Sequence, residues 1–145
     1  MKIGLSIAAI ALGMSLGAAD NWPQFRGPGA MGVSANADLP DEWSAPKNVE
    51  WTLDLPGRGW SSPVVWGKRV FVTTVTTDGK QWGAKKGLYF GGNRYHPPTG
   101  VHLWKVLCLD RGPGKVLWER TPLPGTPRGS IHIANSYASG TPISD

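Results

Sequence analysis

Three side chains near the end of the chain could bind a polar ligand. His132, Asn135 and Tyr137 fall within one short segment, and together they offer an imidazole, an amide and a phenol as hydrogen-bond donors and acceptors. Polar side chains on loops often contact ligands, but they also hydrogen-bond within their own loop. The segment is therefore open to two interpretations, a ligand-binding site or a loop held by its own polar groups.

A metal site is the next possibility, because His96 and His102 flank a turn that contains two prolines. Zinc sites usually combine several His, Cys or carboxylate ligands at short, regular spacings. No Asp, Glu or Cys lies between Lys80 and Leu107, so the two histidines lack further ligands nearby in the sequence. We therefore predict no metal site.

Residues 77–101 form a long, glycine-rich insertion between two strand-like stretches. Loops of this length without secondary structure of their own are usually functional or disordered. The insertion combines aromatic with basic side chains, at Trp82, Lys85, Lys86, Tyr89, Phe90, Arg94 and Tyr95. These side chains could stack a sugar or an aromatic ligand, or they could pack across the face of the protein.

The net charge and the cysteine content bear on two properties of the chain, disulfide formation and nucleic-acid binding. The chain has 145 residues, a net charge of +5 and a single cysteine. Cys108 stands in an apolar stretch, so we expect a buried, unreactive thiol and no intrachain disulfide. The basic excess predicts a cationic surface patch. We interpret that patch as a solvated surface and expect no nucleic-acid partner, because the N-terminus predicts export.

The prediction of export rests on residues 1–19, which have the pattern of a signal peptide. Lys2 is followed by an uncharged, mostly apolar run that ends in small residues at Ala18 and Ala19, as cleavable export signals do. A membrane span needs about 20 predominantly apolar residues, and this run is shorter and contains glycine and serine. We therefore expect no stable membrane anchor, and a mature protein that is periplasmic or secreted.

Strand-like patterns begin after an extended, proline- and glycine-containing arm at residues 20–48. Residues 49–55 alternate apolar and polar side chains, which predicts a half-buried strand. Residues 62–66 and 69–76 are rich in β-branched and aromatic side chains and are separated by Gly67 and Lys68. Two strands joined by two residues predict a β-hairpin.

A second hairpin is predicted after the insertion, from residues 103–110 and 115–120, with a glycine-containing turn between them. Outside the signal peptide no segment has a helical period. We therefore predict an all-β fold with one four-stranded antiparallel sheet and an extra strand at each sequence edge.

An internal repeat extends this prediction. Ser62-Pro63-Val64 is echoed by Thr141-Pro142-Ile143, at an offset larger than the roughly 40 to 50 residues of a propeller blade. The insertion at 77–101 and the proline- and glycine-rich connector at 121–130 account for the excess. The chain is expected to contain about one blade of a β-propeller and the edges of its two neighbours.

Three motifs resemble the repeat of the PQQ-like (quinoprotein-type) β-propeller family. Residues 107–119 combine an apolar strand, an Asp, a glycine turn and an outer strand with a Trp; residues 62–72 resemble the family's first hairpin; and residues 21–28 resemble the Trp-Pro-Gln-Phe-Arg-Gly arm of secreted members. The resemblance implies a structural role for the repeat positions Pro63, Asp110, Gly114 and Trp118. Asp110 would accept hydrogen bonds from turn amides, Gly114 would permit a positive φ, and Trp118 would pack between blades.

The resemblance also carries expectations about function. A propeller needs four to eight blades, so residues 49–145 would be an incomplete repeat region, an N-terminal fragment in which residues 49–55 supply the outer strand of the last blade. Its partners would be the remaining blades and a periplasmic protein or a carbohydrate. We expect an exported, non-catalytic scaffold that holds no cofactor. The alternative is the N-terminal part of a PQQ-dependent alcohol or sugar dehydrogenase, in which PQQ and Ca²⁺ would be bound elsewhere.

Overall fold

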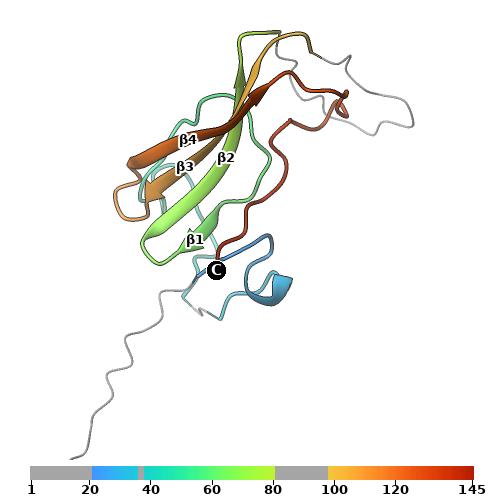
Figure 1. The fold of residues 1–145 in the computed structure, drawn as a ribbon. Coiled ribbons are helices and arrows are strands. Elements are labelled where there is room, and N and C mark those ends of the chain that lie inside the picture. The colour runs from blue at the N-terminus through green and yellow to red at the C-terminus, as the bar shows by residue number, and fades with distance from the viewer. Residues whose placement is uncertain (1–20, 36–37, 81–97) are drawn as a thin grey trace, which may run out of the picture.

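The fold is built on one antiparallel sheet (Figure 1). The computed structural model describes residues 21–35, 38–80 and 98–145. The predicted signal peptide and most of the 77–101 insertion, including His96 and the seven aromatic and basic side chains named above, lie outside these residues. The elements are a short 3-10 turn η1 (Pro28–Ala30) and four strands, β1 (Val64–Trp66), β2 (Arg69–Thr77), β3 (His102–Asp110) and β4 (Val116–Gly125). The predicted all-β fold with a four-stranded antiparallel sheet is confirmed.

Both predicted hairpins are present, and the sheet has the order β1-β2-β3-β4. Trp66 pairs with Arg69 across the first turn. In the second turn the Asp110 side chain accepts a 3.0 Å hydrogen bond from the backbone N–H of Gly112, and its carbonyl accepts one of 2.9 Å from Gly114. Gly114 has φ 69°, a conformation that glycine adopts without the strain that a Cβ would add.

One face of the sheet, here called the core face, carries the main apolar cluster. Val70 and Val72 of β2 pack there with Leu107 and Leu109 of β3. Trp51 packs against this cluster, and its Nε1 donates a 2.9 Å hydrogen bond to the carbonyl of Arg111. Trp51, which precedes β1 in the chain, therefore covers part of the core face.

The predicted strand at residues 49–55 is absent from the structure, and this part of the prediction was wrong. The segment carries no ladder hydrogen bonds, and Val49, Leu53 and Leu55 are exposed. Of these apolar residues, Trp51 is the one that packs against the core cluster, so the alternation reflects the packing of this aromatic side chain and no pairing of the backbone. The residues at the other sequence edge, 142–145, also form no strand.

The opposite face of the sheet is partly covered by the C-terminal segment. The Trp104 Nε1 donates to the carbonyl of Tyr137 at 2.9 Å, and the Thr73 hydroxyl donates to the carbonyl of Gly140 at 3.3 Å. Figure 1 shows this segment returning from the upper end of the sheet to end beside β1. Both faces of the sheet are thus in contact with chain that lies outside the four strands.

The N-terminal arm reaches the free edge of β1. Trp22 and Val65 exchange two backbone hydrogen bonds of 2.8 and 2.9 Å, so the arm pairs with the sheet at this point. The amide of Ser144 in turn donates to the carbonyl of Pro23 at 2.9 Å. In the part of the chain that the structure describes, no helix has the length and apolar character needed to cross a membrane.

Candidate functional site

The segment before β1 follows β2 closely and forms one side of a pocket. Arg58 and Val75 exchange two backbone hydrogen bonds of 2.9 Å. Three residues later, the Ser61 hydroxyl donates to the carbonyl of Thr73 at 3.2 Å and accepts from its amide at 3.4 Å. A side-chain hydroxyl thus replaces a backbone pair, and the segment stays attached to β2 although it is not a regular strand.

Two glycines make this close approach possible. A Cβ added to Gly57 would lie 2.1 Å from the carbonyl oxygen of Val75, and one added to Gly59 would lie 2.4 Å from that of Thr73. Both distances are far below any van der Waals contact, and both obstacles are backbone atoms of β2. Glycine inside an extended segment often marks such an approach, so the alternation of glycine with Arg58 and Trp60 is the sequence signal that could have located this site.

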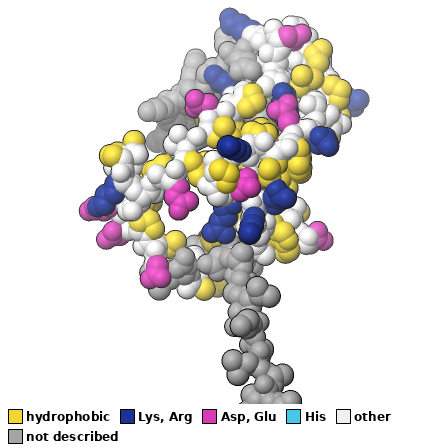
Figure 2. Space-filling model, turned by 90° about the vertical axis from the view of Figure 1, so that its left-hand side faces the viewer, with side chains coloured by type: hydrophobic (Ala, Val, Ile, Leu, Met, Phe, Trp, Pro, Cys, Tyr) yellow, Lys and Arg dark blue, Asp and Glu magenta, His cyan; other side chains and the backbone are white. Residues whose placement is uncertain are grey.

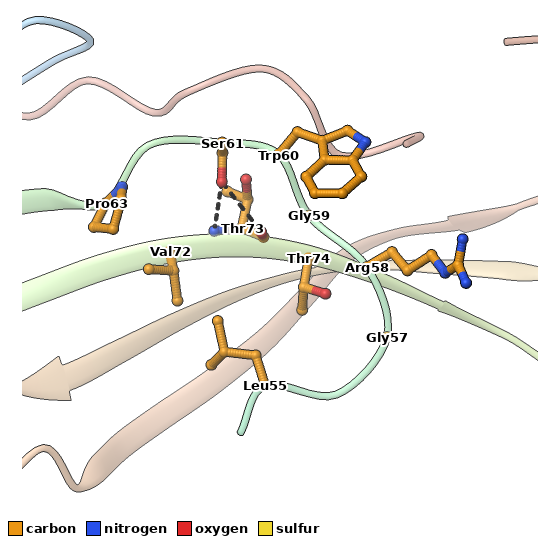
Figure 3. A pocket seen from close by; sticks show the side chains of 10 residues that line it. All are labelled: Leu55, Gly57, Arg58, Gly59, Trp60, Ser61, Pro63, Val72, Thr73 and Thr74. Carbon is orange, nitrogen blue, oxygen red and sulfur yellow. Dashed lines mark hydrogen bonds between the residues drawn. The ribbon is translucent and has the colours of Figure 1, made fainter. Parts of the chain in front are cut away.

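The pocket beside this segment has a volume of about 450 Å³. We call it the Trp60 pocket; its lining residues are Leu55, Gly57, Arg58, Gly59, Trp60, Ser61, Pro63, Val72, Thr73 and Thr74 (Figure 3). Trp60 is 53% exposed, whereas Val72 and Thr74 are buried. Figure 3 shows the Trp60 and Arg58 side chains projecting from the same side of the ribbon, as expected for residues two apart in extended chain.

The three predicted ligand-binding residues occupy two different settings. His132 and Asn135 are exposed and belong to one turn, in which the backbone N–H of Asn135 donates to the backbone carbonyl of His132 at 2.9 Å. The His132 Nδ1 also accepts from the amide of Ala134 at 3.2 Å. These contacts are of the loop-stabilising kind that was one of the two interpretations for this segment.

Tyr137 belongs to an aromatic cluster at the upper end of the sheet. Its ring meets that of His102 edge-on, with centroids 5.1 Å apart, and its hydroxyl donates to the carbonyl of Gly129 at 2.8 Å. Desolvation raises the pKa of the Tyr137 phenol. Tyr137 also lines a second hollow of about 620 Å³. The other lining residues come from β3, from the end of β4 and from the connector that follows β4: Trp104, Leu123, Pro124, Gly125, Thr126, Pro127, Arg128, Gly129 and Ser130.

His102 and Cys108 are held in ways that suit packing. His102 is 4% exposed, and its Nδ1 lies 3.0 Å from the carbonyl of Gly100. Cys108 is 1% exposed, and burial raises the pKa of its thiol. Because the thiolate is the reactive form, Cys108 is a poor nucleophile. Within the described ranges, no three His, Cys, Asp or Glu residues are grouped closely enough to hold a metal ion.

The four repeat positions have distinct surroundings. Pro63 lines the Trp60 pocket, and Asp110 organises the second turn. Gly114 is buried beneath the ring of Trp51. A Cβ added to Gly114 would lie only 2.4 Å from an atom of that ring. Trp118 is 39% exposed; its ring centroid lies 6.1 Å from that of Phe71.

Comparison of the chain with known protein families, with curated proteins and with solved structures finds no match to any of them.

Proposed function

We propose that this chain is an exported, non-catalytic scaffold or binding protein whose four-stranded sheet is one blade of a β-propeller of the PQQ-like repeat family. The observation that carries the proposal is the hydrogen bond of 2.9 Å from the backbone amide of Ser62 to Oγ1 of Thr141. These two residues hold the same position in the echoed Ser-Pro-Val and Thr-Pro-Ile motifs. In a propeller, equivalent strands of successive blades gather around the central channel, so equivalent positions are expected to be neighbours.

The opposite face of the sheet supplies a second argument. The register places Phe71, Cys108 and Trp118 in one row across β2, β3 and β4, and Trp118 is 39% exposed. Trp66, at the end of β1, is exposed to the same extent. Cys108 in the middle of the row is already buried, so the exposed aromatic members of this face are Trp118 and Trp66. A neighbouring blade would cover these two tryptophans.

The Trp60 pocket supports binding over catalysis. Among the described residues, its lining includes one charged residue, Arg58, and no His, Cys, Asp or Glu. General acid–base catalysis at neutral pH uses such titratable groups, whereas an apolar hollow with a few polar groups is typical of a binding site.

The charges on one face of the molecule bear on the class of partner. In Figure 2, acidic side chains are interspersed among the Lys and Arg side chains of the face shown, and hydrophobic side chains lie between them. Nucleic-acid-binding proteins instead gather basic residues into a patch or stripe. A protein or carbohydrate partner suits this mixed surface better.

Thermal unfolding of two proteins tests the proposal: residues 20–145 alone, and the complete gene product, meaning this chain with any further repeats that its gene encodes. A blade without its neighbours leaves large apolar side chains in water, each forfeiting about 1.5 to 3 kcal/mol, which is a large share of the usual 5 to 15 kcal/mol of stability. We expect residues 20–145 to aggregate or unfold broadly and the complete gene product to melt cooperatively. A sharp, reversible transition of monomeric residues 20–145 would overturn the proposal.

A further inference from the structure

We propose that the N-terminal arm is a built-in peptide ligand, which occupies a strand-binding site at the edge of β1 and can be replaced there by a separate peptide of the same sequence. The part of the arm that binds is called the arm module and comprises residues 21–32. The inference goes beyond the proposed function, because it depends on the contacts of the arm module and not on the number of blades.

The arm module binds by pairing its backbone with the edge of the sheet. Trp22 exchanges two backbone hydrogen bonds of 2.8 and 2.9 Å with Val65 of β1. The side-chain oxygen of Asn21 accepts a further hydrogen bond of 2.7 Å from the amide of Gly67, in the turn that follows β1. Pairing of an extended segment with an exposed sheet edge is a recurring mode of peptide recognition. The edge of β1 therefore has the contacts of a strand-binding site.

The other side of the arm module meets the C-terminal segment at an equivalent position. The amide of Ser144 donates a 2.9 Å hydrogen bond to the carbonyl of Pro23. Ser144 follows the Thr-Pro-Ile motif just as Val65 follows the Ser-Pro-Val motif. Figure 1 shows the blue N-terminal arm next to the C-terminal end of the chain, below β1. The site thus lies between the two copies of the echoed motif, and the arm module bonds to the same position of each copy.

The arm module is also held in shape by its own contacts. The carbonyl of Gln24 accepts a 2.9 Å hydrogen bond from the amide of Gly27, and that of Arg26 accepts one of 2.7 Å from the amide of Gly32. The Trp22 ring lies against Gly27, since a Cβ added to Gly27 would come within 2.6 Å of that ring. A peptide that is preorganised in this way loses less conformational freedom when it binds.

The chain that connects the arm module to the sheet is exposed. Residues 38–50 are exposed throughout, and the 2.6 Å ion pair between Glu42 and Lys47 joins two residues of this same stretch. A segment with little buried surface can open locally at a small cost in free energy. The arm module can therefore leave its site while the four strands stay packed.

Binding of a separate peptide tests the inference, using the complete gene product and a variant of it that lacks residues 20–32. The probe is a fluorescently labelled peptide of residues 20–32, and fluorescence anisotropy measures its binding. We expect saturable binding to the deletion variant. The intact protein should bind the peptide at least about tenfold more weakly, because its own arm competes at a local concentration on the order of millimolar.

Variant peptides identify the contacts that carry the binding. Asn21→Ala removes the acceptor of the Gly67 amide and should weaken binding by about three- to tenfold, the fold-change of one ordinary hydrogen bond. Gly27→Ala places a Cβ against the Trp22 ring. Gly29→Ala is its matched control, because Gly29 also has a positive φ, 59°, but a Cβ there lies 3.6 Å from its nearest neighbour, the Met31 side chain. Gly27→Ala should bind at least about fivefold more weakly than Gly29→Ala.

Circular dichroism establishes whether the deletion variant is folded. A deletion variant that is unfolded would overturn the inference, because the arm would then be part of the core and not a separable ligand. A folded deletion variant that shows no saturable binding would overturn it as well, and so would equal affinities of the parent, Asn21→Ala and Gly27→Ala peptides. The propeller proposal is tested separately, by the melting of residues 20–145, and does not depend on these outcomes.

Discussion

The backbone amide of Ser62 donates a 2.9 Å hydrogen bond to Oγ1 of Thr141, which lies 79 positions further along the chain. Both residues are half-buried, so the bond is partly shielded from water. The bond fixes the C-terminal segment beside the chain that leads into β1. It is one of several contacts that hold this segment, together with the hydrogen bond from the Trp60 amide to the carbonyl of Ala138.

Thr141→Val tests this contact, because valine keeps the shape of threonine and removes the hydroxyl. A typical intramolecular hydrogen bond contributes about 0.5 to 1.5 kcal/mol, so we expect a lower melting temperature of the complete gene product. Thr141→Ser, which retains the hydroxyl, should lose much less. Equal melting temperatures for the valine and serine variants would show that the bond contributes nothing to stability.

Gly59→Ala should be strongly destabilising. The added Cβ would meet the carbonyl oxygen of Thr73 at 2.4 Å, and relief of that clash requires the segment to leave β2. Overpacking of this kind costs about 1 to 3 kcal/mol. Gly129→Ala is the control, because a Cβ there meets no atom within 4 Å, and its effect should stay within about 0.5 kcal/mol. Chemical denaturation of the two variants would reveal the difference, and similar midpoints would contradict the close approach.

Cys108 should make stability depend on pH above neutrality. Burial raises the pKa of its thiol in the folded state, so as the pH rises past the ordinary value of about 8.5 the unfolded chain loses the proton first. The free energy of unfolding should therefore fall from that pH upward. Melting temperatures at pH 7.5 and 9.5 should differ more for the parent than for Cys108→Ala. The same difference in both proteins would show that other groups cause the pH dependence.

Residues 20–145 should neither bind PQQ nor oxidise an alcohol. The described part of the chain has no group of three acidic, histidine or cysteine side chains that could hold Ca²⁺, and the sequence has one cysteine, which excludes a vicinal pair. Titration with PQQ and Ca²⁺, followed by a dye-reduction assay with ethanol and glucose, measures both properties. Saturable binding with turnover would favour the dehydrogenase alternative.

Processing of the N-terminus can be measured directly, although residues 1–19 lie outside the described part of the structure. The intact mass of the protein secreted from a suitable host should correspond to loss of the segment that ends near Ala19. Soluble cytoplasmic protein that retains Met1 would contradict the prediction of export.

The four strands and the two hairpins could be predicted from the sequence because their signals are local. β-Branched and aromatic residues favour extended backbone over residues 69–76. Gly67 and Gly114 mark the two turns, because glycine adopts the positive φ that these turns require. The structure extends β4 beyond the predicted end at Arg120 to Gly125, through two prolines. Proline is tolerated there because β4 is an edge strand, whose outer N–H groups need no partner within the sheet.

The placement of residues 49–55 and of the Trp60 pocket depended on tertiary contacts. An alternating pattern shows that one side of an extended segment is apolar, but it does not show whether the backbone pairs with a strand. In residues 49–55 the backbone forms no strand, and Trp51 packs its side chain against the core face. The pocket likewise requires Gly57 and Gly59 to lie against carbonyl groups of β2 that are 14 or more residues away in the chain. The sequence alone determined the all-β class, the order of the strands along the chain and the burial of Cys108, because these follow from the patterns of neighbouring residues. The tertiary structure decided which side chains meet at a site, because contacts between distant residues depend on the packing of the whole sheet.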